Sequence, residues 1–105
     1  MIIMNEIKIN IGDPWDNTCL GKEKARVLFE NVPKDADKII FNFGNILYVG
    51  CLFVKEYLLL KESVKFEVEE VNVWAEVQKS FDMVKDLGIH SNDNILIQKF
   101  IDAEL

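Results

Sequence analysis

The sequence predicts an α/β fold, a small β-sheet covered by helices, and two alternating patterns lead to this prediction. Short runs rich in Ile, Val and Phe, typical of strands, recur at residues 5–11, 39–43 and 65–71. Longer segments with apolar residues at helical spacing follow them, at residues 18–31, 51–63 and 73–86. Such alternation is typical of a parallel or mixed sheet with crossover helices.

Length and composition predict one acidic globular domain covering residues 1–105. Half of the residues are hydrophobic, and the formal net charge is −6. Such a charge does not attract nucleic acid or an anionic membrane, so a protein partner with a basic surface is more plausible. Because the sequence has neither a secretory signal pattern nor an apolar run of membrane-spanning length, we expect a cytoplasmic protein.

The first strand and helix are expected at the outside of the sheet. Residues 5–11 alternate between isoleucine and polar residues, as in an edge strand with one solvated face. The loop that follows carries Trp15, either as a ligand platform or as a lid on the core. Thr18 is the expected N-cap of a helix running to about Asn31.

The second strand and helix are expected to form the centre of the fold. Residues 39–43 are almost continuously apolar, which predicts a strand covered on both faces. A turn at Gly44-Asn45 follows, and Tyr48-Val49 can add a short extra strand pairing. Gly50 permits a positive φ or a close backbone approach just before the helix at residues 51–63.

Two leucines lie on the polar side of that predicted helix. Leu52 and Leu59 are one heptad apart, in a stripe that also contains Lys55 and Glu56. They either contact a neighbouring loop or sit singly exposed, as many leucines do, or they form an apolar pair offered to a partner. The expected buried side of this helix comprises Phe53, Val54, Tyr57 and Leu60.

The last third of the chain predicts a strand and two helices. Glu67, Glu69 and Glu70 give the third strand an acidic edge that discourages sheet-to-sheet pairing, with cation binding or acid–base chemistry as the alternative. Asn72 is the expected N-cap of the next helix, and Gly88 is expected to end it. Residues 94–105 fit a helix capped by Asn92 or Asp93 better than a strand.

Residues that carry chemistry are few and scattered, which predicts a protein without catalytic activity, metal or cofactor. Cys19 and Cys51 are expected as free thiols. Cys51, near a helix N-terminus, is either a reactive thiolate or, more commonly, a small buried residue. His90 is the only histidine and has no partner at metal-ligand or general-base spacing.

The segment from Tyr48 to Glu56, Tyr-Val-Gly-Cys-Leu-Phe-Val-Lys-Glu, resembles the loop-into-helix motif of the STAS-like family of unknown function. More distantly it resembles the STAS domains of anti-sigma factor antagonists, and the segments at residues 72–77 and 81–89 agree in order and spacing. The resemblance implies a small mixed sheet with helices packed on one face. The phosphorylatable serine of the antagonists falls at Leu52, which cannot accept phosphate.

The resemblance places the partner-facing surface at the start of the central helix. It therefore implies a regulatory protein-interaction module, bacterial or phage-borne, whose partner is a kinase-like or other regulatory protein. The expected partner-binding residues are Gly50, Cys51, Leu52, Lys55, Glu56 and Leu59. One alternative is a small-ligand-binding domain, with Trp15 and Asn45 in its loops. The other is a structural homodimer that uses an edge strand, the Leu52/Leu59 face or the loops around Trp15 and Gly50.

Overall fold

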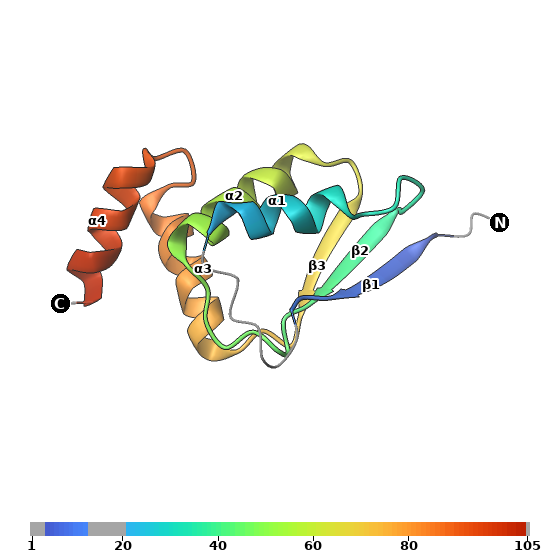
Figure 1. Cartoon of the computed structure of the whole chain (residues 1–105), viewed down its shortest axis with the longest axis horizontal. Helices are drawn as coiled ribbons and strands as arrows, with labels where there is room; N and C mark the ends of the chain where they lie inside the picture. The colour runs from blue at the N-terminus through green and yellow to red at the C-terminus, as the bar shows by residue number, and fades with distance from the viewer. Residues whose placement is uncertain (1–3, 13–20, 105) are drawn as a thin grey trace.

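The computed structural model describes residues 4–12 and 21–104 and confirms the α/β class (Figure 1). Strands and helices alternate, as the sequence predicted. The elements in chain order are β1 (Glu6–Asn10), α1 (Lys22–Glu30), β2 (Lys38–Asn42), α2 (Cys51–Ser63), β3 (Glu67–Val71), α3 (Ala75–Leu87) and α4 (Asp93–Glu104). Thr18, the expected N-cap of the first helix, and Cys19 lie outside the described residues.

The described strands form one sheet in the order β1-β2-β3, with the apolar strand β2 in the centre. Both ladders are parallel, and Ile7, Ile39 and Val68 lie side by side across the sheet. The sequence pattern predicted a parallel or a mixed sheet, and the described part of the chain supplies only parallel pairs. Tyr48 and Val49 lie in a loop and add no pairing within this part.

Helices pack on one face of the sheet (Figure 1). Ile39 and Phe41 of β2 point to that face and are fully buried. Ile40 points to the other face and is only half-buried, between exposed Lys8 and Glu69 on the neighbouring strands. The expectation that the central strand is covered on both faces is therefore wrong for the described part of the chain.

Aromatic rings fill the space between the sheet and the helices. The Tyr57 ring from α2 lies at the centre, with ring centroids 5.7 Å from Phe41 and 5.8 Å from Phe43. Phe29 of α1 and Phe81 of α3 approach the same ring at 5.4 and 5.5 Å. These tilted contacts suit aromatic quadrupoles and join three helices to the central strand.

The helix ends follow local sequence signals in most places. Gly88 follows α3 with a φ of 98°, a conformation that favours glycine, as the sequence predicted. Asn92 caps α4, because its side-chain oxygen accepts a hydrogen bond from the Asn94 backbone N–H at 2.8 Å. The helical alternative for the tail is thereby confirmed over Asp93–Glu104.

One predicted cap is wrong. Asn72 does not cap α3: the N-cap residue is Trp74, which makes no side-chain cap hydrogen bond. Asn72 instead adopts a φ of 57° directly after β3. Asparagine tolerates this left-handed conformation better than most residues. In this conformation the Asn72 side chain is directed toward the end of β2, where it bonds to Asn42.

α4 lies at the far end of an elongated molecule, away from the sheet (Figure 1). The molecule measures 53 × 30 × 21 Å along its principal axes. Asp93 ties the start of α4 to the body through Lys55 of α2 at 2.6 Å and Lys22 of α1 at 3.1 Å. No helix in the described part of the chain combines the length and apolar character needed to cross a bilayer.

Candidate functional site

The carboxyl edge of the sheet, where the parallel strands end, brings two loops together. The chain leaves β2 through residues 43–50 and leaves β3 through residues 72–74, and both loops lie at the same edge (Figure 1). A hydrogen bond joins them: the Trp74 indole Nε1–H donates to the Gly44 carbonyl oxygen at 2.9 Å. Ligands of open α/β sheets bind at this edge, so it is the first place to look for a site.

Three asparagines form a row across this edge, here called the amide row: Asn10, Asn42 and Asn72. The Asn42 Nδ2 group donates to Asn10 Oδ1 at 2.9 Å. Its oxygen accepts from Asn72 Nδ2 at 2.9 Å and from the Gly44 backbone N–H at 3.0 Å. Asn42 is therefore the residue that fixes both loops relative to the strand ends.

The geometry explains why glycine follows Asn42 so closely. A Cβ atom at Gly44 would lie 3.1 Å from Asn42 Oδ1 and 3.6 Å from the Asn72 Cβ. The first distance is tighter than an ordinary contact, so any larger residue requires the Asn42 amide to shift by a few tenths of an ångström. Gly44 is needed for close packing, and its φ is not in the positive range.

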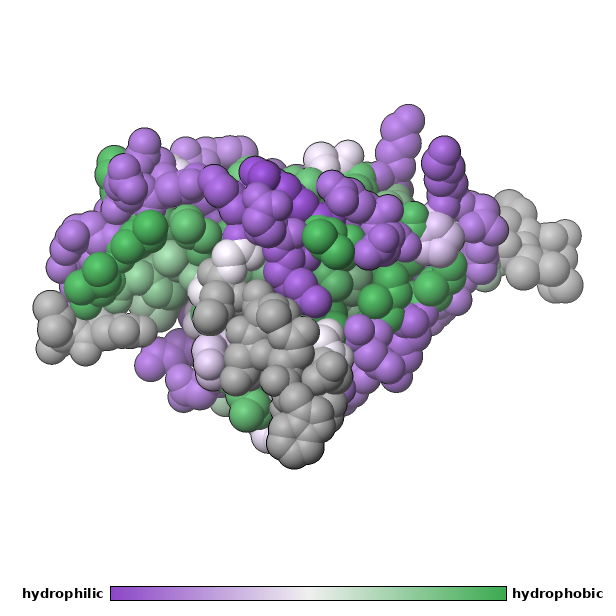
Figure 2. Space-filling view, in the orientation of Figure 1, coloured by the Kyte–Doolittle hydropathy of each residue, from purple (hydrophilic) through white to green (hydrophobic). Residues whose placement is uncertain are grey.

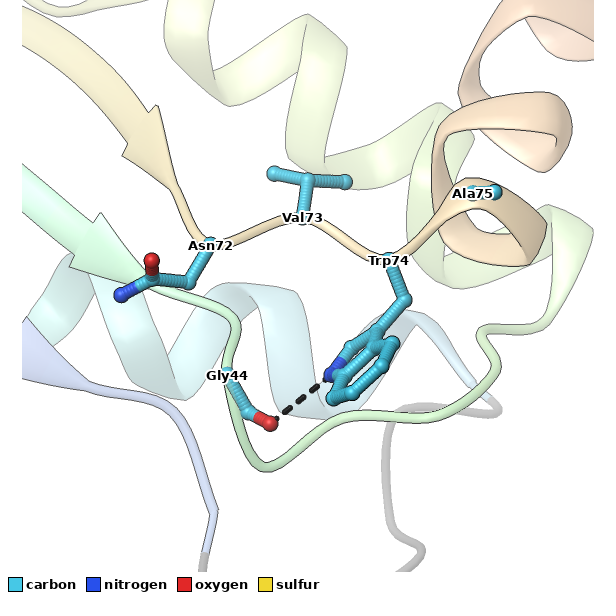
Figure 3. Close-up of a pocket in the computed structure, with 5 residues that line it drawn as sticks. All are labelled: Gly44, Asn72, Val73, Trp74 and Ala75. Atoms are coloured by element: carbon cyan, nitrogen blue, oxygen red, sulfur yellow. Dashed lines mark hydrogen bonds between the residues drawn. The ribbon is translucent and has the colours of Figure 1, made fainter.

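A shallow cavity of about 480 Å³ lies beside the fixed tryptophan (Figure 3). Its lining residues are Gly44, Asn72, Val73, Trp74 and Ala75. The Trp74 ring extends beside Gly44, whereas the Val73 side chain points the opposite way (Figure 3). Because 53% of Trp74 is exposed although its N–H is bonded, the ring is held in place with a surface open for stacking.

The loop at residues 43–50 exposes two further apolar side chains. Ile46 and Val49 are buried and anchor the loop, whereas Leu47 and Tyr48 between them are 59% and 51% exposed. Exposed large apolar groups that gather in one region commonly mark interaction sites. We define the carboxyl-edge surface as Leu47, Tyr48 and Trp74.

The first three predicted partner-binding residues lie where this loop enters α2. Gly50 is the N-cap residue with an extended φ of −83°, so glycine is not required there for a positive φ. Cys51 is half-buried, and burial raises the pKa of its thiol, which argues against the reactive-thiolate alternative. Leu52 is half-buried and packs against the core, so it is not a freely presented side chain.

Of the other three predicted residues, Lys55 and Glu56 form ion pairs within the molecule and Leu59 is half-buried. The Lys55 ammonium donates to the Ser91 carbonyl and to Asp93, and it anchors α4. Glu56 accepts from Arg26 Nε at 3.1 Å, which joins α2 to α1 and raises the pKa of that guanidinium. Leu59 is half-buried. The six residues therefore do not form one open surface.

Of the two residues predicted to line a ligand loop, Trp15 and Asn45, the structure describes only Asn45. Trp15 lies outside the described residues. Asn45 is exposed in the turn after Gly44, but the cavity beside it is lined by Trp74 and Asn72 instead. Sequence reasoning assigned Asn72 to a helix cap and gave Trp74 no role, and so missed both as site residues.

The three glutamates of β3 separate into two environments. Glu67 and Glu69 are exposed on the uncovered face, where Glu69 pairs with Lys38 at 2.9 Å. Glu70 turns inward, contrary to the predicted acidic edge, and accepts from the Tyr57 hydroxyl at 2.8 Å and from Lys61 at 3.0 Å. Burial, with the Glu70 charge, raises the pKa of Tyr57 far above its ordinary value, so the hydroxyl acts only as a donor.

Within the described ranges, no three His, Cys, Asp or Glu side chains lie close enough to hold a metal ion. Comparison of the chain with protein-family models, curated proteins and solved structures finds no match in any of the three. The STAS-like resemblance therefore stays a prediction. Function has to be argued from the surfaces and contacts of the chain itself.

Proposed function

We propose that this protein is a non-enzymatic, cytoplasmic interaction module that docks a protein partner through its carboxyl-edge surface. The observation that carries the proposal is the exposure of Leu47, Tyr48 and Trp74, each more than half exposed, on two loops at one edge of the sheet. Tyrosine and tryptophan are the residue types that dominate binding energy in protein interfaces. Leu47 and Tyr48 lie just before α2, the helix at which the sequence placed the partner-facing surface, and Trp74 lies just before α3.

The rigidity of the surface supports the proposal. Trp74 is fixed by Gly44, and Gly44 is fixed in turn by the amide of Asn42. A side chain that is already held in its bound orientation loses less conformational entropy when a partner covers it. The amide row thus orders the aromatic anchor of the surface in advance.

Charge narrows the class of partner. The chain carries a net charge of −6, so a partner with a basic rim associates faster than a neutral or acidic one. An arginine or lysine from such a partner also suits the exposed face of the Trp74 ring through a cation–π contact. We expect binding to weaken as salt concentration rises.

Site-specific photocrosslinking in the native host tests the proposal. A benzoylphenylalanine at position 48 should capture a partner, and adding Trp74→Ala should remove the crosslinked product. The matched control places the same probe at Ile95 of α4, which is 53% exposed and lies outside the carboxyl-edge surface. Equal capture from positions 48 and 95, or capture that survives Trp74→Ala, contradicts docking at this surface.

The cavity beside Trp74 favours a second candidate function, the binding of a small planar ligand. Its volume of about 480 Å³ lies within the usual range of ligand sites, and Asn72 Oδ1 forms no hydrogen bond with a described residue. A flat uncharged heteroaromatic ring can stack on the exposed face of Trp74 in this cavity, which Asn72 also lines. Trp15→Phe leaves Trp74 as the only tryptophan, so saturable quenching by adenosine, abolished by Asn72→Ala, would support this candidate.

A further inference from the structure

The sheet has two edges that no described strand pairs, and their outward backbone groups can be assigned. In β1, the Asn5 carbonyl accepts from Lys38 N–H and the Ile11 N–H donates to the Asn42 carbonyl, so odd-numbered residues turn toward β2. Backbone groups alternate along a strand. The N–H and C=O groups of the even-numbered residues Glu6, Lys8 and Asn10 therefore point away from the sheet and are available to another strand.

We propose that a second copy of this chain pairs antiparallel with β1, so that two sheets of three strands join into one continuous sheet. The lateral edge of β1 is separate from the carboxyl-edge surface, so this inference goes beyond the proposed docking function. The pairing is isologous, because the same strand of each copy contacts the other across a two-fold axis.

Charge decides which edge can pair with its own copy. In β3 the backbone N–H and C=O groups of the even-numbered residues point away from β2. The odd-numbered residues bond toward β2, because the Glu67 N–H donates to the Asp37 carbonyl and the Val71 carbonyl accepts from the Phe43 N–H. Each antiparallel register that joins three or more β3 residues then sets a glutamate of one copy opposite a glutamate of the other. Like charges directly opposite are unfavourable, so β3 is protected against self-pairing.

β1 can pair with its own copy in a register that sets opposite charges, rather than like charges, directly opposite each other. When Ile7 lies opposite Ile7 of the second copy, Glu6 of each chain lies opposite Lys8 of the other, in hydrogen-bonded positions. This register forms two symmetry-related ion pairs on the uncovered face. A shift by one residue in each copy sets Lys8 opposite Lys8 and is opposed by repulsion. A register centred on Ile9 sets Lys8 opposite Asn10 and forms no ion pair, so the charges of β1 favour the register centred on Ile7.

Apolar surface beside β1 supports the same contact. Hydrophobic residues gather between α1 and the outer strand in the space-filling view (Figure 2). Ile7 and Ile9 point to the helix-covered face but remain half-buried, and Val27 of α1 is 45% exposed. In the paired sheet the helix-covered faces of the two copies lie on the same side, and Ile7 of one copy lies directly opposite Ile7 of the other.

A charge-swap experiment tests the pairing on the full chain. Sedimentation analysis of the wild type over a wide concentration range should give a monomer–dimer equilibrium. Lys8→Glu alone and Glu6→Lys alone should each weaken dimerisation at least about tenfold, since each sets like charges opposite. An equimolar mixture of the two variants, and the double variant E6K/K8E, should restore it. Lys99→Glu on α4 is the matched control and should leave dimerisation unchanged.

Hydrogen exchange identifies the edge used. The amides of Glu6, Lys8 and Asn10 should exchange more slowly in concentrated than in dilute protein, whereas the outward amides of Val68 and Glu70 should not change. A monomer at all concentrations, assemblies that grow beyond two chains through β1 and β3, or a dimer unaffected by the charge reversals would each overturn the proposal.

Discussion

Replacement of Asn42 by alanine should disorder the carboxyl-edge surface and destabilise the fold together. The change removes three hydrogen bonds, to Asn10 at 2.9 Å, to Asn72 at 2.9 Å and to the Gly44 N–H at 3.0 Å. The two amide–amide bonds are exposed, and water replaces them in part. We therefore expect the free energy of unfolding to fall by about 2 kcal/mol, with the larger share from the part-buried Gly44 bond.

Asn10→Ala is the matched control for this prediction. It removes only the outermost bond of the amide row, so the loss should be about 0.5 kcal/mol, and Gly44 keeps its acceptor. Urea unfolding followed by circular dichroism gives both values, and hydrogen exchange of the Gly44 amide reports the loop. If Asn42→Ala costs no more than Asn10→Ala, or leaves Gly44 exchange unchanged, Asn42 does not organise the site.

Two further predictions concern the contacts that hold the helices. Tyr57→Phe removes a fully buried hydroxyl that donates to the Glu70 carboxylate, so unfolding free energy should fall by about 1–3 kcal/mol, while Tyr48→Phe in the exposed loop should change nothing. Hydrogen bonds from Lys55 and then Lys22 lower the pKa of Asp93, so its carboxylate stabilises the fold above the unfolded pKa of about 3.9. That stability is lost as pH falls through the folded pKa. Asp93→Asn should therefore lower the melting temperature at neutral pH and leave it equal to that of the wild type in acid. If the wild type and the variant differ in melting temperature by the same amount at both pH values, the ion pairs of Asp93 do not stabilise the fold.

The α/β class, the central position of residues 39–43 and the two edge strands followed from apolar patterns along the chain, although the burial of both faces inferred for residues 39–43 was wrong. The end of α3 at Gly88 and the helical tail followed from local signals. Each of these features depends on residues that are neighbours in sequence.

The site was less accessible to sequence reasoning because its contacts join distant segments. Asn72 fits the composition of a helix cap, and only its partner Asn42, which lies 30 residues away, shows that it belongs to the amide row. Lys55 sits in a polar stripe that suggests a free surface, yet it is bonded to Ser91 in the turn before α4 and to Asp93 at the start of α4. Leu52, in the same stripe, is half-buried and packs against the core. Helical periodicity describes one helix and not what packs against its polar side.

Hydrogen-exchange mapping of the chain with and without the partner captured from position 48 tests the docking proposal most directly. The proposal predicts slower exchange in the loops at residues 44–50 and 73–76, with α4 unchanged. Protection confined to α4 or to the uncovered face of the sheet, with both loops exchanging as in the free protein, would contradict it.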